Sequence, residues 1–183
     1  LTLLGAEPDG NSIDARQPFD LDGSNAPAID VVLSFSGSTA GLTIGDFAVF
    51  VTGGPTPVLA SVIPNGNDAR LQFTPALPVT PFVPHWLEIT HTASGGTMCF
   101  GYLPADVSGD RTATTLDPAR ADLTRLVQCL DGQGTPCSPY QCDLDRSGGT
   151  CNPLDLMRWI DLLNGAEMYD PMEGMTLLAW PCP

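Results

Sequence analysis

The stretches Asp143-Leu144-Asp145-Arg146-Ser147-Gly148 and Asp106-Val107-Ser108-Gly109-Asp110 read alike, and they decide how the C-terminal part of this chain folds. In both, oxygen-bearing side chains occupy every second position. A hard cation such as Ca²⁺ needs this arrangement of ligands from a tight loop. The repeated pattern therefore predicts two cation-binding loops.

Each stretch leads into a segment with helical periodicity. Apolar residues stand at positions 123, 126, 127 and 130 after the first loop, and at 156, 159, 160 and 163 after the second. This i, i+3, i+4, i+7 spacing is typical of one face of an amphipathic helix. Gly132 and Gly165 follow the two stripes and are expected at helix C-caps.

The composition limits the classes of partner. The chain has 183 residues, 21 acidic and 7 basic, with a net charge of -14. The length suits one or two domains. A negative field of this size repels phosphate backbones and attracts divalent cations, so no nucleic-acid partner is expected.

Six cysteines in a chain rich in Asp, Gly and Pro favour disulfides and an oxidising compartment. None forms a C-x-x-C pair and only two histidines are present, so a zinc site has little support. No apolar run approaches the ~20 residues of a membrane span. The chain begins with Leu1 rather than Met, which is expected after removal of a signal peptide. A chain trimmed in another way would begin in the same manner. We expect an extracellular protein, secreted or on a cell surface.

Residues 1–104 have the pattern of an all-β sandwich, because short alternating apolar runs are separated by turn residues. The alternating positions are Val31, Leu33 and Phe35; Phe47, Val49 and Val51; Leu71 and Phe73; and Leu87 and Ile89. Asn65-Gly66-Asn67-Asp68 is one of the expected turns. About seven strands in roughly a hundred residues match an immunoglobulin-like (Ig-like) domain. The segments 29–35, 42–47 and 71–75 resemble the bacterial Ig-like modules of secreted and surface-layer proteins.

Residues 106–165 resemble the dockerin domain, and most of all the dockerin-like tails of large secreted bacterial proteins. The resemblance is carried by Asp-Leu-Asp-Arg-Ser-Gly from Asp143 and by the helical run that ends in Leu163-Asn164-Gly165. It implies two Ca²⁺ ions, each in a half EF-hand of one loop and one exit helix, with the two helices packed antiparallel. The expected fold is mainly β with a small α part, an Ig-like sandwich over 1–104 and a dockerin-like calcium domain over 105–183.

The candidate metal ligands follow from the repeat. They are Asp106, Ser108, Asp110, Asp117 and Asp122 in the first loop, and Asp143, Asp145, Ser147 and Asp155 in the second. The first loop has two candidates for its closing ligand. Asp117 stands at the usual EF-hand spacing, about 11 residues after the first aspartate, whereas Asp122 aligns with Asp155. The repeat favours Asp122, and the alternative that these aspartates only cap helices and turns stays open.

Proximity in the chain favours a Cys142–Cys151 disulfide around the second loop and a Cys129–Cys137 disulfide after the first helix, which leaves Cys99 for Cys182. The sequence does not fix this pairing.

The function expected from these features is structural rather than enzymatic, because neither a Ser-His-Asp or Cys-His set nor a glycine-rich phosphate loop is evident. A subunit of a surface layer or extracellular fibre is one reading. In it, the apolar segments 1–4 and 175–180 add to a neighbour's sheet, unless they fold back on their own chain.

Two alternatives remain. The first is calcium-dependent docking to a cohesin-like partner. The Ser-Thr-like pair that dockerins present before the closing Asp is replaced by Arg120-Ala121 and Pro153-Leu154, with Thr115-Leu116 before Asp117. The second is carbohydrate binding, for which the scattered Trp86, Trp159 and Trp180 give little platform.

Overall fold

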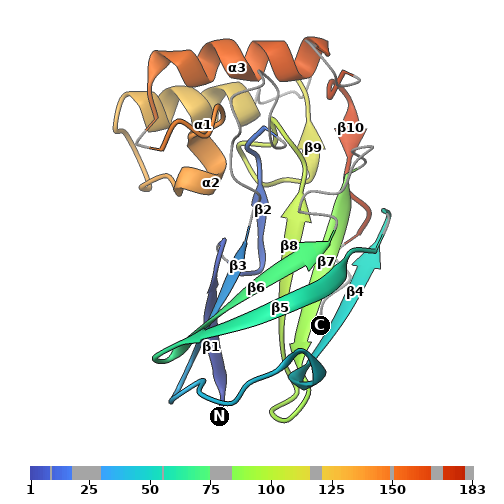
Figure 1. Ribbon diagram of the computed structural model, residues 1–183. Coiled ribbons are helices and arrows are strands. Elements are labelled where there is room, and N and C mark those ends of the chain that lie inside the picture. The colour runs from blue at the N-terminus through green and yellow to red at the C-terminus, as the bar shows by residue number, and fades with distance from the viewer. Residues whose placement is uncertain are drawn as a thin grey trace. The chain divides into compact units, whose positions relative to one another are not determined.

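A computed structural model of the chain describes residues 1–8, 10–17, 30–54, 56–74, 84–115, 121–148, 151–165 and 171–179 (Figure 1). The chain forms two compact units. The first consists of Leu1–Ser12, Ala28–Gly101 and Leu178–Pro183, and the second of Ile13–Pro27 and Tyr102–Leu177. The sequence predicted consecutive domains over 1–104 and 105–183, whereas each unit contains a segment from the far side of that boundary.

The first unit is built on two four-stranded sheets. One has the order β1 (Leu3–Glu7), β3 (Val31–Phe35), β6 (Asp68–Thr74) and β5 (Val58–Asn65). The other has the order β2 (Ser12–Asp14), β8 (Gly96–Tyr102), β7 (His85–His91) and β4 (Phe47–Thr52), although residues 13 and 14 of β2 are counted with the second unit. The strand pairs whose register is described are antiparallel, and a 3-10 turn (Ile44–Asp46) leads into β4.

The two sheets enclose the core of this unit. The side chains of Val31, Leu33 and Phe35 are buried, as their alternation predicted. The Phe35 ring on β3 lies 6.4 Å from that of Phe47 on β4 and 5.1 Å from that of His91 on β7. These ring contacts join one sheet to the other, and the prediction of a mainly β first part is confirmed.

The second unit contains the α-helices of the described residues, joined by loops and two short strands. Its elements are β9 (Thr112–Ala113), α1 (Ala121–Leu130), α2 (Pro139–Cys142), α3 (Pro153–Asn164) and β10 (Met175–Thr176) (Figure 1). α3 begins at a capping box, in which the Asn152 side chain accepts the Leu154 N–H at 2.8 Å and Asp155 accepts the Asn152 N–H at 2.8 Å. It ends at Gly165, whose φ of 74° gives the left-handed C-cap expected there.

The buried faces of the helices are narrower than the predicted stripes. Leu126 on α1 and Trp159 and Leu163 on α3 are buried as expected. Val127 and Ile160 were expected on the same faces, yet each is 41% exposed. The stripe predicted too wide a buried face, because only one side of each helix packs on its own unit.

A segment near the N-terminus, residues 13–17, packs in the second unit and is called the strap below. The backbone carbonyls of Asp14 and Ala15 accept the N–H groups of Leu103 and Ala105, at 3.2 and 2.8 Å. On this side the strap therefore holds the segment that leads into the first loop.

The other side of the strap holds the segment that leads into the second loop. The N–H groups of Ala15 and Gln17 donate to the carbonyls of Tyr140 and Leu144, both at 2.8 Å. The Gln17 side-chain amide also donates to the Asp145 carbonyl at 2.9 Å. The strap is thus the physical reason that residues 13–17 belong to the second unit.

Both apolar terminal segments pair within their own chain. Leu3–Glu7 forms β1 beside β3, and Met175–Thr176 forms β10 beside β9. In the first unit, the Leu178 carbonyl accepts the Trp86 indole N–H at 3.0 Å. The structure thus follows the fold-back alternative for these segments; Trp180 lies outside the described residues.

Candidate metal centre

Loop 1 is organised around the carboxylate of Asp106, which is fully buried. This carboxylate accepts hydrogen bonds from the backbone N–H groups of Gly109 (2.8 Å), Asp110 (3.1 Å) and Arg111 (2.8 Å) and from the Ser108 hydroxyl (3.3 Å). The loop backbone therefore curls around Asp106. Ser108 and Asp110 lie in the same turn, as the spacing predicted.

Asp122, the second residue of α1, lies at the same loop. One of its carboxylate oxygens accepts the Ser108 N–H at 2.9 Å, and the other accepts the Thr114 N–H at 3.2 Å. Asp122 is also fully buried. Of the two candidates for the closing position, Asp122 is thus at the loop, and Asp117 lies outside the described residues.

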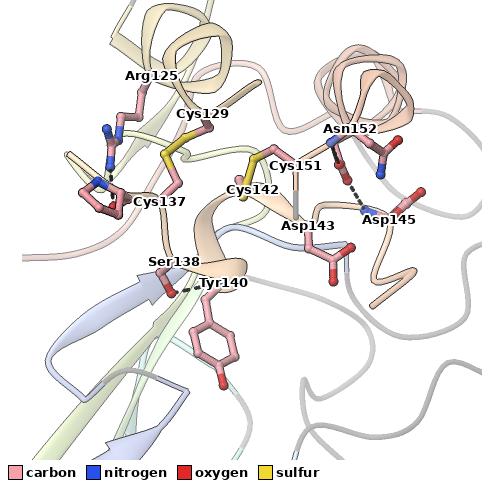
Figure 2. Close-up of a disulfide and its surroundings, with 12 residues drawn as sticks. Arg125, Cys129, Cys137, Ser138, Tyr140, Cys142, Asp143, Asp145, Cys151 and Asn152 are labelled. Carbon is pink, nitrogen blue, oxygen red and sulfur yellow. Dashed lines mark hydrogen bonds between the residues drawn. A yellow bond between two sulfur atoms is a disulfide. The ribbon is translucent and has the colours of Figure 1, made fainter. Parts of the chain in front are cut away.

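Loop 2 brings three of its predicted ligands together. Carboxylate oxygens of Asp143, Asp145 and Asp155 lie within 4.8 Å of one another. The Ser147 hydroxyl donates to Asp143 at 3.3 Å. Asp155, in the first turn of α3, accepts the Asp145 N–H at 3.3 Å, just as Asp122 accepts the N–H of Ser108. Figure 2 shows Asp143 and Asp145 beside Asn152 at the start of α3.

The two loops share positive φ angles at two matching positions. Counting each first aspartate as position one, the fourth residues are Gly109 (φ 76°) and Arg146 (φ 58°), and the sixth are Arg111 (φ 78°) and Gly148 (φ 80°). In both loops the sixth N–H donates to the first aspartate, at 2.8 Å from Arg111 and 3.2 Å from Gly148. Each loop therefore has one arginine with a positive φ, where L residues are strained. It is the sixth residue in loop 1 and the fourth in loop 2.

This strain was missed from the sequence, where only the glycines signalled a positive φ. The local turn overrides the preference of the arginine at each position, because the N–H of the sixth residue must reach the first carboxylate. When the two loops are aligned, a glycine in one loop occupies the same position as an arginine in the other.

Two further residues brace the loops from a distance and also went unpredicted. The Glu173 carboxylate accepts the Thr114 hydroxyl at 2.6 Å and the Thr115 N–H at 3.0 Å, after loop 1. Gln17 of the strap holds the Asp145 carbonyl of loop 2. Each occurs once, outside the repeat, so no sequence pattern marked them.

Burial makes these carboxylates costly to charge. The pKa of Asp106 is raised to about 7, first by burial and next by the negative charge of Asp122. Burial also raises the pKa of Asp122 and the pKa of Asp155, against hydrogen bonds from backbone N–H groups that lower both. A bound cation would reverse this effect, since it offsets the repulsion between neighbouring carboxylates.

The residues of loop 1 fit a hard divalent cation. Ion pairs in the described residues join Arg16 to Asp14 and Arg70 to Asp30, and neither places an arginine on Asp106 or Asp122. Carboxylate and hydroxyl oxygens are the donors that Ca²⁺ takes in flexible geometry. A soft metal is not served by this set, which contains no sulfur or imidazole.

One disulfide spans loop 2, and a second joins the end of α1 to the segment before α2 (Figure 2). Cys142 pairs with Cys151 across the loop, with Cα atoms 5.2 Å apart, and Cys129 pairs with Cys137, with Cα atoms 5.6 Å apart. Both predicted pairings are confirmed. Cys99 is also disulfide-bonded, and its predicted partner, Cys182, lies outside the described residues.

No helix within the described residues is long and apolar enough to cross a membrane. The chain matches no family model, and neither a curated protein nor a solved structure was found to match it. The two loops must therefore be interpreted from their own geometry.

Proposed function

We propose that this chain is a non-enzymatic extracellular structural protein, stabilised by two Ca²⁺ ions, that forms a subunit of a surface layer or extracellular fibre. The observation that carries the proposal is the pair of loops in which a buried aspartate from the following helix accepts the N–H of the third loop residue. Asp106, Ser108, Asp110 and Asp122 would hold one ion, and Asp143, Asp145, Ser147 and Asp155 the other. The ions would neutralise buried carboxylates and fix each loop to its exit helix.

The resemblance to dockerin domains is supported by the half EF-hand order of loop and exit helix in both copies. The Ig-like assignment is supported by strand order. The sheets β1-β3-β6-β5 and β8-β7-β4 correspond to the ABED and CFG sheets of an immunoglobulin constant domain, with β2 added beside β8.

Surface composition supports assembly. Phe50 on β4 and Val58 on β5 are 66% and 67% exposed, and each strand stands last in the order of its sheet. Exposed apolar side chains on such strands favour pairing with another chain. Extracellular placement is supported by the disulfides, which persist in oxidising compartments.

Calcium binding is tested by titrating metal-depleted full-length protein with CaCl₂ in a calorimeter. We expect two bound ions for the wild type and for Asp131→Asn, an exposed aspartate outside both loops. Asp155→Asn should bind one ion, because it removes the closing carboxylate of loop 2. Binding of no calcium by the folded wild type would contradict the assignment.

Assembly is tested by light scattering and negative-stain imaging of the full chain at rising concentration with calcium. We expect polymers that Phe50→Ser weakens and that Ala48→Ser, an exposed change on the same strand, leaves intact. A strictly monomeric wild type at high concentration would overturn the structural role but not the calcium sites.

Docking to a partner is the second candidate. It is favoured by apolar side chains on α3, namely Leu154 (65% exposed), Met157 (58%) and Ile160 (41%). Leu154 stands where dockerins usually present a hydroxyl, so any partner must offer an apolar surface rather than the usual cohesin one. Calcium-dependent retention of one partner protein that is lost in Leu154→Ser with Met157→Ser would support docking. Trp86 and Trp159 are buried and offer no exposed aromatic surface for a carbohydrate.

A further inference from the structure

Two disulfides of the second unit lie next to each other. The Sγ atoms of Cys129, Cys142 and Cys151 are all within 4.8 Å of one another. Cys129 is bonded to Cys137, and Cys142 to Cys151. Figure 2 shows the Cys129 end of the first bridge facing the second bridge. Of the first bridge it is therefore Cys129, and not Cys137, that belongs to this sulfur cluster.

The first bridge borders a cavity. A hollow of about 220 Å³ is lined by residues 128, 129 and 132–137, both cysteines of the bridge included. Gly132 and Gly134 in its wall have positive φ angles, of 64° and 78°. Both bridge sulfurs belong to half-buried residues, so a small solute can approach them from the cavity.

The positively charged Arg125 side chain is hydrogen-bonded to the wall of this cavity. The Arg125 guanidinium donates to the carbonyls of Thr135 (2.9 Å) and Pro136 (3.3 Å), directly before Cys137 (Figure 2). In a chain of net charge -14, this is a local attraction for an anionic thiolate.

We propose that the Cys129–Cys137 bridge is a thiol-exchange site that takes a small thiol and passes the exchange on to the Cys142–Cys151 bridge. The incoming thiolate bonds to Cys137 Sγ, the Cys129–Cys137 bond breaks, and the electron pair leaves on Cys129 as a thiolate. Cys129 then bonds to Cys142 Sγ, the Cys142–Cys151 bond breaks, and Cys151 leaves as a thiolate. The incoming thiol and the protein together neither gain nor lose electrons.

The direction of the second step follows from burial and packing. Cys142 is 3% exposed whereas Cys151 is half-buried, so Cys151 is the sulfur that can leave into water. Cys142 ends α2, which packs against α1, where Cys129 lies. The product, a Cys129–Cys142 bond, therefore joins two helices that already touch, and it releases the closure of loop 2.

Paired variants of the full-length chain test this inference, which does not rest on the proposed function. Cys137→Ser leaves Cys129 free beside the second bridge, and Cys129→Ser leaves Cys137 free outside the sulfur cluster. Each is purified without reductant, alkylated with N-ethylmaleimide and mapped after pepsin digestion in acid, where exchange stops. Circular dichroism checks that both fold.

We expect a Cys129–Cys142 bond with alkylated Cys151 in Cys137→Ser. Alkylated Cys151 should be at least about tenfold more abundant there than in Cys129→Ser, because Cys129 Sγ lies within 4.8 Å of both sulfurs of the second bridge and Cys137 is outside that group. Equal scrambling in both variants, or an intact Cys142–Cys151 bridge in both, would overturn the inference.

The wild type provides a second test should either variant misfold. With reduced glutathione, the first products should be a glutathione adduct on Cys137 and a Cys129–Cys142 bond. Adducts that form first on Cys142 or Cys151 would show that the thiol enters elsewhere and would overturn the proposed order.

Discussion

Asp106 shows at the scale of a single residue what the proposed ion would change in these loops. Its pKa of about 7 in the folded state lies above the ordinary aspartate value of 3.8, so folding without metal favours the protonated form. That contribution to stability is full below about pH 4 and is lost as the pH rises through about 7. Bound calcium demands the opposite form, because it coordinates the deprotonated carboxylate.

The pH dependence should therefore change sign with the metal. We expect the melting temperature of metal-depleted protein to fall between about pH 4 and pH 7, and that of calcium-saturated protein to rise over the same range. Differential scanning calorimetry on protein stripped with a chelating resin measures both series. The same trend with and without calcium would contradict the role given to these carboxylates.

Gly165 and Gly132 offer a matched pair of single-residue changes. A Cβ on Gly165 would lie 2.7 Å from atoms of Pro171, whereas one on Gly132 would meet nothing within 4 Å. Both glycines have positive φ, 74° and 64°. Gly132→Ala should therefore cost about 1 kcal/mol of unfolding free energy from backbone strain alone. Gly165→Ala should cost clearly more, and equal losses in urea titrations would refute this account of the α3 C-cap.

At the scale of the element, loop 2 is held by a disulfide as well as by its carboxylates. Replacing both Cys142 and Cys151 by Ser should lower the unfolding free energy by about 2–3 kcal/mol, because the opened loop regains conformational freedom in the unfolded state. Calorimetry should show weaker calcium binding at this loop only. A loss of equal size at both loops would mean that the bridge supports the whole unit instead.

Local elements were the part that the sequence predicted well. The alternation of Val31, Leu33 and Phe35 and the turn at Gly66 marked a sheet, because a strand with one buried face must alternate. The spacing from Asp143 to Ser147 marked loop 2 for the same kind of local reason. The helix faces were less well predicted, since Val127 and Ile160 depend on which neighbours cover them.

At the scale of the whole molecule, the strap could not be predicted. No pattern in residues 13–17 indicates their hydrogen bonds to residues 103–105 and 140–145, because pairing over long sequence distances leaves no local pattern. The same is true of Glu173, which reaches back to Thr114. The position of Asp122 at loop 1 was open from sequence for a related reason, since 16 positions separate Asp106 from Asp122 and only 12 separate Asp143 from Asp155.

Calcium removal should act on the second unit and leave the first one folded. We expect amide exchange to quicken over 105–115 and 121–148 and also in the strap, whose backbone bonds depend on the segments before both loops. Strand β3 should keep its protection. Hydrogen exchange with and without EGTA measures this, and an unchanged strap would show that it is held independently of the ions.

The strap also means that the two units cannot be parted by one break in the backbone. A cut after residue 104 leaves residues 13–17 on one fragment and their partners at 140–145 on the other. Halves produced separately, 1–104 and 105–183, would each lack a piece that the other holds. The chain is thus suited to fragment complementation, in which two incomplete polypeptides recover a fold that neither can finish alone.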